Sequence, residues 1–155
     1  MDAIASAMDD VAKTTLGASG CSVVGPRSGE GELSGGYLAI VGDKFSAQVA
    51  VASDPPTCRR IAARLFEEDE AAADSLPEGD VADAIGELVN IVGGIVKTKM
   101  SEEDPTLQLG LPFVIEGVIE STSRLKTEYV EADLGDMKVV LVVILDTQHG
   151  VDAAA

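Results

Sequence analysis

The sequence predicts an α+β domain in which long helices pack on a largely antiparallel β-sheet. Apolar residues first recur with a helical period, then as a pair of strand-like runs, then with helical periods again, and finally as strands. Two of the strand-like runs are separated by only residues 42–44, a spacing typical of a hairpin. The 155 residues are 46% hydrophobic but only 3% aromatic. We therefore expect a single domain over residues 1–155 with an aliphatic core.

The first predicted element is an amphipathic helix over residues 2–16, which Gly17 would end. Its apolar residues are Ile4, Met8, Val11 and Leu16. A short strand over residues 21–24 follows, and then a glycine-rich loop over residues 25–31.

The hairpin is predicted from strands at residues 37–41 and 45–52. Asp54 then caps a second helix, because two prolines follow it and proline is tolerated in a first helical turn. This helix is expected to stop near Asp69, and acidic residues 67–80 are expected to form a solvated connector. The apolar side of the helix would consist of Cys58, Ile61, Ala62, Leu65 and Phe66.

The C-terminal third predicts extended structure, with a turn at residues 133–136 and a frayed tail over residues 146–155. The last run, KVVLVVIL, is apolar on both faces. Such a strand belongs either in the middle of a sheet or at an edge that pairs with another subunit, and the second reading would give a homodimer. The expected strands are residues 110–120, 123–131 and 138–145.

Between these two parts lies a long predicted helix over residues 80–100, with Asp80 as its cap and Lys99 in its last turn. One side is a wide apolar stripe that must be buried. The stripe consists of Val81, Ala84, Ile85, Leu88, Ile91, Val92, Ile95 and Val96. The opposite side carries residues spaced by four and three, which should face water or a partner. We call this side the polar ribbon: Asp83, Glu87, Asn90, Gly94 and Lys97.

Three glycines lie within this helix, although each costs about 1 kcal/mol relative to alanine. Gly86 lies one turn before Asn90, and Gly93 and Gly94 lie one turn after it. The amide of Asn90 would therefore stand on a bared surface that a partner can approach closely. For Gly93, which is nearer the apolar side, close packing within the chain is an equal alternative.

The ribbon resembles the signature of the CheC/CheX/FliY family of response-regulator phosphatases, and most closely a CheX-like member. The resemblance is carried by Asp83-x-x-x-Glu87-x-x-Asn90, the Gly94 and Lys97 that follow, and Pro112 in the run LGLPF. A bare Glu-x-x-Asn would be a weak signal, so the additional positions carry the weight. The resemblance extends over nearly the whole chain and implies the same α+β architecture.

The resemblance implies hydrolysis of the phospho-aspartate of a CheY-like response regulator, in chemotaxis or related two-component signalling. Asn90 would position the attacking water, and Glu87 would anchor the partner. Partner binding is assigned to Asp83, Gly86, Gly94 and Lys97. Mg²⁺ is expected on the response regulator and no cofactor on this chain. CheX-type relatives also suggest a homodimer.

Each residue has a plainer alternative reading. Glu87 can be a surface acid, and Asn90 an ordinary exposed helical residue. Asp83 can be a charge at the helix start, Lys97 a complement to the helix dipole, and Pro112 a residue that shapes the entry to a strand. A non-catalytic module that docks on a receiver domain or signalling complex is therefore the alternative function.

The remaining features of the sequence argue against several kinds of function and partner. With a net charge of −16, nucleic acid and anionic membranes are poor partners. Residues with the spacing of a zinc site, a P-loop or a Ser/His/Asp triad are missing, and Cys21 and Cys58 are expected to be buried thiols. No apolar run reaches the roughly 18 residues of a membrane span, so a cytoplasmic location is expected. The first helix offers Asp10 and Lys13 but no Asn, which argues against a second copy of the motif.

Overall fold

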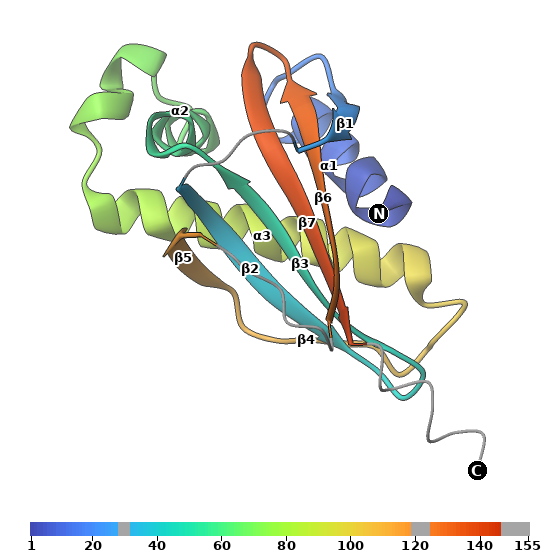
Figure 1. Cartoon of the computed structure of the whole chain (residues 1–155). Helices are drawn as coiled ribbons and strands as arrows, with labels where there is room; N and C mark the ends of the chain where they lie inside the picture. The colour runs from blue at the N-terminus through green and yellow to red at the C-terminus, as the bar shows by residue number, and fades with distance from the viewer. Residues whose placement is uncertain (28–31, 119–124, 147–155) are drawn as a thin grey trace.

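The computed structural model, shown in Figure 1, describes residues 1–27, 32–118 and 125–146. Its strands form one seven-stranded sheet in the order β1-β6-β7-β3-β2-β4, and β5 also pairs with β2. All of the pairings are antiparallel, which confirms the predicted fold class. The elements are α1 (Asp2–Thr14), β1 (Cys21–Pro26), β2 (Leu33–Val41), β3 (Ser46–Ser53), α2 (Pro55–Leu65), the 3₁₀ helix η1 (Glu70–Ser75), α3 (Glu78–Met100), β4 (Gln108–Leu109), β5 (Phe113–Gly117), β6 (Leu125–Leu134) and β7 (Met137–Asp146).

Helices α1 and α3 pack on the same face of the sheet, and α3 crosses behind β2, β3 and β7 in Figure 1. The main core lies between the sheet and the helices α1, α2 and α3, and it is made mostly of aliphatic side chains, with the buried thiol of Cys58 from α2. A smaller cluster around Tyr37 and Val142 lies apart from this core. The long helix contacts the sheet, α1 and α2, and its exposed residues, such as Asp83 and Glu87, lie on the remaining side.

The predicted hairpin is confirmed, but β2 begins at Leu33, four residues before the predicted start. Gly35 and Gly36 explain the difference. A Cβ on Gly36 would lie 2.7 Å from the backbone oxygen of Ile85 in α3, and a Cβ on Gly35 would lie 2.5 Å from the Cβ of Ala52 in β3. Glycine weakens a strand in isolation, but Gly36 lets α3 approach the sheet closely, and Gly35 lets the neighbouring strand β3 do so.

Strand β7 lies between β6 and β3, in the interior of the sheet. The interior reading of KVVLVVIL is therefore right, and Leu141 and Val142 are fully buried. The alternative, that this strand forms a free edge for a second subunit, is wrong, because both sides of β7 are hydrogen-bonded within the chain.

The end of α2 differs from the prediction. The helix ends at Leu65 rather than near Asp69, because Glu67 adopts a left-handed conformation (φ 57°). The connector over residues 67–80 is not simply a solvated coil, since it contains η1. Arg64 reaches Glu70 at 2.7 Å and Asp136 at 2.9 Å, and Arg60 pairs with the same two acids. These ion pairs join α2, η1 and the β6–β7 turn.

One of the two predicted helix caps is present and the other is not. Asp54 caps α2 as expected, because its carboxylate accepts the backbone N–H of Thr57 at 2.9 Å. Asp80 does not cap α3, which begins two residues earlier at Glu78, so that Asp80 lies in the first turn instead. The tail beyond Asp146, with His149, lies outside the described residues.

Asp104 fixes the chain just after α3. Its side chain is almost fully buried, and it accepts the Thr106 hydroxyl at 2.5 Å and the Lys44 backbone N–H at 2.8 Å. These two bonds, the hydroxyl first, lower the pKa of the Asp104 carboxyl. The C-terminal end of α3 is thereby tied to the β2–β3 hairpin.

Both cysteines are free, as predicted. Cys58 is buried and Cys21 only half-buried, so the expectation of two buried thiols holds fully for Cys58 alone. Burial raises the pKa of each thiol to about 11.

Candidate functional site

The two sides of α3 are separated as the spacing predicts. Five residues of the predicted stripe are buried in the core: Ala84, Ile85, Leu88, Val92 and Val96. The other three, Val81, Ile91 and Ile95, are only partly buried and pack against the core. Asp83 and Glu87 are exposed, whereas Asn90, Gly94 and Lys97 are partly exposed. Sequence reasoning missed Val89, which is fully buried because Gly36 of β2 lies against it. The polar ribbon therefore faces away from the core.

The polar groups of the ribbon are not used by the fold. Within the described residues, the side chains of Asp83, Glu87, Asn90 and Lys97 make no hydrogen bond or ion pair with another side chain or the backbone. Lys99, two residues beyond the ribbon, differs because it pairs with Asp10 of α1 at 3.2 Å. An acid and an amide one turn apart are left available for a partner.

The three helical glycines fall into two kinds. A Cβ on Gly93 would lie 2.1 Å from the Leu38 Cδ2, so packing within the chain explains this glycine. A Cβ on Gly86 or Gly94 would meet nothing within 4 Å. Internal packing thus does not require glycine at these two positions, although each weakens the helix.

Pro112, which lies far from the ribbon in sequence, is brought next to it. A depression of about 490 Å³ lies between α3 and the start of β5, with Asp83, Gly86 and Glu87 on one wall and Pro112 on the other. The segment is placed by Gly110, whose N–H donates to the Ala39 oxygen at 2.8 Å, and by the pairing of β5 with β2. Asp83 and Glu87 of the motif therefore line one depression with the distant proline, whereas Asn90, Gly94 and Lys97 are not among its lining residues.

A second depression, of about 390 Å³, lies on the other side of the same carboxylates. We call it the Phe66 groove; its lining residues are Thr15, Leu65, Phe66, Asp83, Ala84, Glu87 and Ile91. Phe66 was predicted to belong to the apolar side of α2, but it lies just beyond the helix and is 46% exposed. The available signal was its position directly before the acidic run EEDE.

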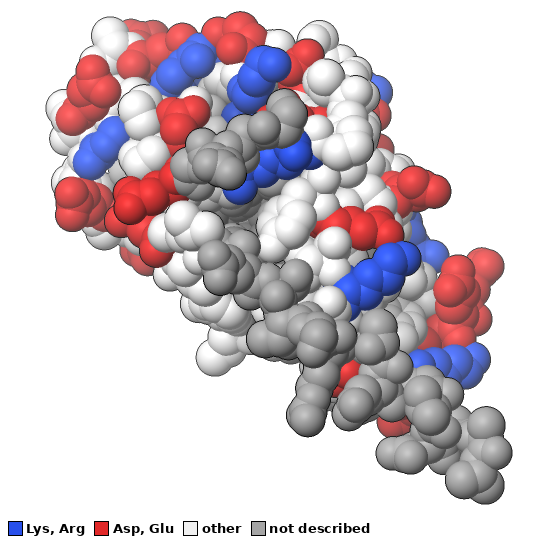
Figure 2. Space-filling view, in the orientation of Figure 1, with Lys and Arg blue, Asp and Glu red and all other residues white. Residues whose placement is uncertain are grey.

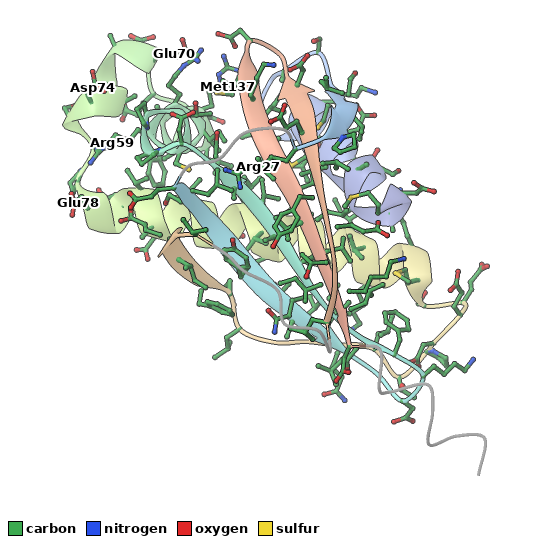
Figure 3. All side chains as sticks on the ribbon, viewed as in Figure 1. Arg27, Arg59, Glu70, Asp74, Glu78 and Met137 are labelled. Carbon is green, nitrogen blue, oxygen red and sulfur yellow. The ribbon has the colours of Figure 1, made fainter. Side chains whose placement is uncertain are left out.

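Acidic side chains gather at the end of the molecule formed by α2 and η1 (Figure 2). The arginines there are engaged in binding the connector: Arg59 donates to the Leu76 oxygen at 2.6 Å, beside Glu78 at the start of α3 (Figure 3). Hydrogen bonds from Arg64 and then Arg60 lower the pKa of Glu70. The fold therefore engages these three arginines.

Two further findings concern the described part of the chain only. Residues 1–27, 32–118 and 125–146 contain no group of three His, Cys, Asp or Glu side chains that could hold a metal ion. None of the described helices is long and apolar enough to cross a bilayer.

Fold and site together define a class: a small α+β domain whose longest helix carries an acid and an amide without partners among the described residues, near two glycines at which a Cβ would meet no other atom within 4 Å. The chain belongs to the CheX family, because residues 35–131 match the family model described as chemotaxis phosphatase CheX. A comparison with curated proteins found no match.

Several solved structures share the fold at low identity. The chemotaxis protein CheX from Vibrio vulnificus is 17% identical, with a TM-score of 0.72 over 94% of this chain and 97% of that one. CheX in a CheX–CheY–BeF₃–Mg²⁺ complex from Borrelia burgdorferi is 21% identical, with a TM-score of 0.71 over 93% and 95%. FliY from Thermotoga maritima is 14% identical, with a TM-score of 0.66 over 98% and 88%. The predicted CheX-like resemblance is thus confirmed.

Proposed function

We propose that this chain hydrolyses the phospho-aspartate of a CheY-like response regulator, in the cytoplasm, in chemotaxis or related two-component signalling. The observation that carries the proposal is the unpartnered pair Glu87 and Asn90, which stands between two glycines that internal packing does not require. Family membership supports it. So does the Borrelia burgdorferi structure, in which a CheX is in complex with CheY, BeF₃ and Mg²⁺.

Asn90 is assigned the positioning of the attacking water. In the reaction, the water oxygen bonds to phosphorus, the bond from phosphorus to the aspartyl oxygen breaks, and phosphate and a free carboxylate result. An acyl phosphate is already activated, so alignment of water in line with the leaving oxygen is the main requirement. An amide supplies one acceptor and two donors without adding negative charge beside the anionic phosphoryl group.

Glu87 is assigned the anchoring of the partner, by pairing with a cation on the receiver domain. It lies about 4.5 Å along the helix axis from Asn90, so the two can reach neighbouring groups on one receiver. Asp83 and Lys97 extend the contact along the ribbon, and Gly86 and Gly94 let the receiver approach the helix backbone. Mg²⁺ is assigned to the response regulator, where it would neutralise phosphoryl charge.

The test is the decay of phosphoryl label on a CheY-like receiver in Mg²⁺, with catalytic amounts of the chain or of its Asn90→Ala variant. We expect repeated turnover by the wild type and at least a hundredfold slower turnover by the variant, comparable to the loss of one positioned transition-state contact. Equal rates for the two proteins would remove Asn90 from the mechanism.

The same open glycines also support a second function, docking on a receiver without catalysis. In that case neither protein would accelerate the decay, and a bulky residue at Gly94 would still abolish binding. Binding of the chain to a receiver loaded with BeF₃⁻ and Mg²⁺ separates the two functions, because it does not depend on turnover.

We further propose a homodimer, as CheX-type relatives suggest, formed through an outer strand rather than through β7. Strand β5 pairs only with β2 among the described strands, and its Phe113 and Ile115 are 46% and 39% exposed. A dimer mass by light scattering at micromolar concentration is expected, and a monomer mass would remove the proposal.

A further inference from the structure

The Phe66 groove adjoins the polar ribbon and is not accounted for by the assigned roles of the ribbon residues. Its floor is apolar, formed by Leu65, Phe66, Ala84 and Ile91, and its rim carries the carboxylates of Asp83 and Glu87. Phe66 is one of only three phenylalanines in the chain. A large apolar side chain that is nearly half exposed beside two free carboxylates suggests an interaction surface.

The backbone holds Phe66 in this outward position. Glu67 is the only non-glycine residue with a positive φ among the described residues, at the place after a helix where glycine is usual. The N–H of Glu68 donates to the Ala63 oxygen at 2.9 Å and closes the helix end around Phe66. A left-handed glutamate is unfavourable, so the exposed ring is fixed at some cost to local stability.

Ion pairs hold in place the end of α2 that carries Leu65 and Phe66 and forms one wall of the groove. Arg64, one turn before Glu67, contacts both Glu70 and Asp136, and these contacts join the end of α2 to η1 and to the β6–β7 turn. The hydrogen bonds of Arg60 and then Arg64 also lower the pKa of Asp136, so that the network is charged at neutral pH. A groove with a fixed wall requires little ordering when a partner binds.

The charge around the groove defines the chemistry of its occupant. No basic residue lines the groove, two of its lining residues are acidic, and the exposed run Glu67, Glu68 and Asp69 follows Phe66 directly. Lys or Arg beside a large apolar side chain would satisfy both the rim and the floor. An acidic or wholly polar segment would be repelled or poorly packed.

We propose that the Phe66 groove is a second docking point for the receiver domain, which takes an apolar side chain flanked by Lys or Arg next to the phosphorylation site. This inference rests on the proposed function, because the groove and the ribbon share Asp83 and Glu87. A receiver seated on Asn90 would cover the groove as well. The groove then selects among receivers, whereas Asn90 acts on the bound one.

The test compares KM and kcat of Phe66→Ala with those of the wild type on a phosphorylated receiver. We expect KM to rise about tenfold, as for removal of an aromatic interface anchor, while kcat stays unchanged because Asn90 is untouched. Val24→Ala in β1 is the matched control, since Val24 is 57% exposed and lies outside both depressions. Asp83→Asn should weaken the salt dependence of KM.

Affinity for the BeF₃⁻- and Mg²⁺-loaded receiver separates this proposal from the proposed function. If the wild type binds but does not turn over, tenfold weaker binding by Phe66→Ala still supports the groove, although the phosphatase proposal has failed. Unchanged KM and unchanged affinity, in a variant with the wild-type unfolding midpoint, overturn it. A fall from dimer to monomer mass in Phe66→Ala at unchanged receiver affinity would instead assign the groove to a second copy of the chain, and also overturns the proposal.

Discussion

Helices α1 and α3 lie on the same face of the sheet and contact each other, but they use their polar residues in opposite ways (Figure 1). On α1, Asp9 pairs with Lys13 at 2.7 Å and accepts the N–H of Cys21 at 2.9 Å. Asp10 pairs with Lys99 at 3.2 Å. On α3, the ribbon residues Glu87 and Asn90 have no such partner within the described residues.

Polar side chains that the fold already uses, as on α1, are not available to bind a partner, whereas the unpaired ones on α3 are. The hydrogen bond from Lys13, followed by that from the Cys21 backbone, lowers the pKa of Asp9, so this carboxylate contributes to folding. A second active site on α1 would have to break these contacts first. The ribbon side chains Glu87 and Asn90 of α3 have no such partner within the described residues, so substitutions there should change activity rather than stability.

The largest expected effect is that of Asn90→Asp. The substitution keeps the size of the side chain but places a carboxylate beside the phosphoryl group, so turnover should fall more than a hundredfold. Because the Asn90 side chain makes no hydrogen bond or ion pair within the described residues, the urea midpoint should not change. The rate of phosphate release measures turnover, and urea unfolding measures the midpoint. Retained turnover would show that the amide is not what the reaction uses.

Gly94→Leu should have the next largest effect. A Cβ at Gly94 meets nothing within 4 Å in this chain, so a longer side chain there starts in open space. It would, however, stand between the helix and an approaching receiver, and we expect KM to rise at least tenfold. Titration against a receiver loaded with BeF₃⁻ and Mg²⁺ measures the affinity. Wild-type affinity would place the receiver elsewhere on the chain.

Gly93→Ala and Gly94→Ala form a matched pair that isolates packing. Alanine at Gly93 would lie against Leu38 in the core and should destabilise the protein by about 1–2 kcal/mol, as overpacking does. Alanine at Gly94 should stabilise it by up to ~1 kcal/mol, because the helix gains propensity without a clash. Chemical denaturation measures both. The same sign for both variants would contradict the distinction between the two glycines.

The smallest effect is expected on α1, from Asp9→Asn. The pKa of Asp9 is lowered in the folded state, so its contribution is full above the ordinary Asp pKa of about 3.9. The contribution disappears as the pH falls through the lower folded-state value. Unfolding midpoints from pH 7 to pH 3 should show a less stable variant at neutral pH and a difference that closes in acid. Turnover should stay at the wild-type rate.

Much of the fold could be predicted because local patterns determine it. The spacing of apolar residues identified α1 and α3, the three-residue connection identified the hairpin, and Asp54 before two prolines identified the start of α2. The misses depend on long-range contacts. Gly36 is tolerated in β2 because Ile85 lies against it, and residues 70–75 form η1 while Arg60 and Arg64 hold Glu70.

The site was predictable in part for the same reason. A helical period places Asp83, Glu87 and Asn90 on one side whatever the rest of the chain does. Which glycines face open space could not be predicted, because that depends on where Leu38 lies. The groove beside Phe66 was missed, because it forms only when the ends of α1 and α2 meet α3.

The difference between the polar residues of α1 and those of α3 is tested most directly with the variants Asn90→Ala and Asp9→Asn. Turnover and unfolding free energy are measured for both. We predict opposite results: Asn90→Ala loses at least a hundredfold in turnover and keeps its unfolding free energy within about 0.5 kcal/mol, whereas Asp9→Asn keeps its turnover and loses stability. Full turnover by Asn90→Ala, or a matching loss of stability in that variant, would contradict the claim that the outward side of α3 is reserved for the partner.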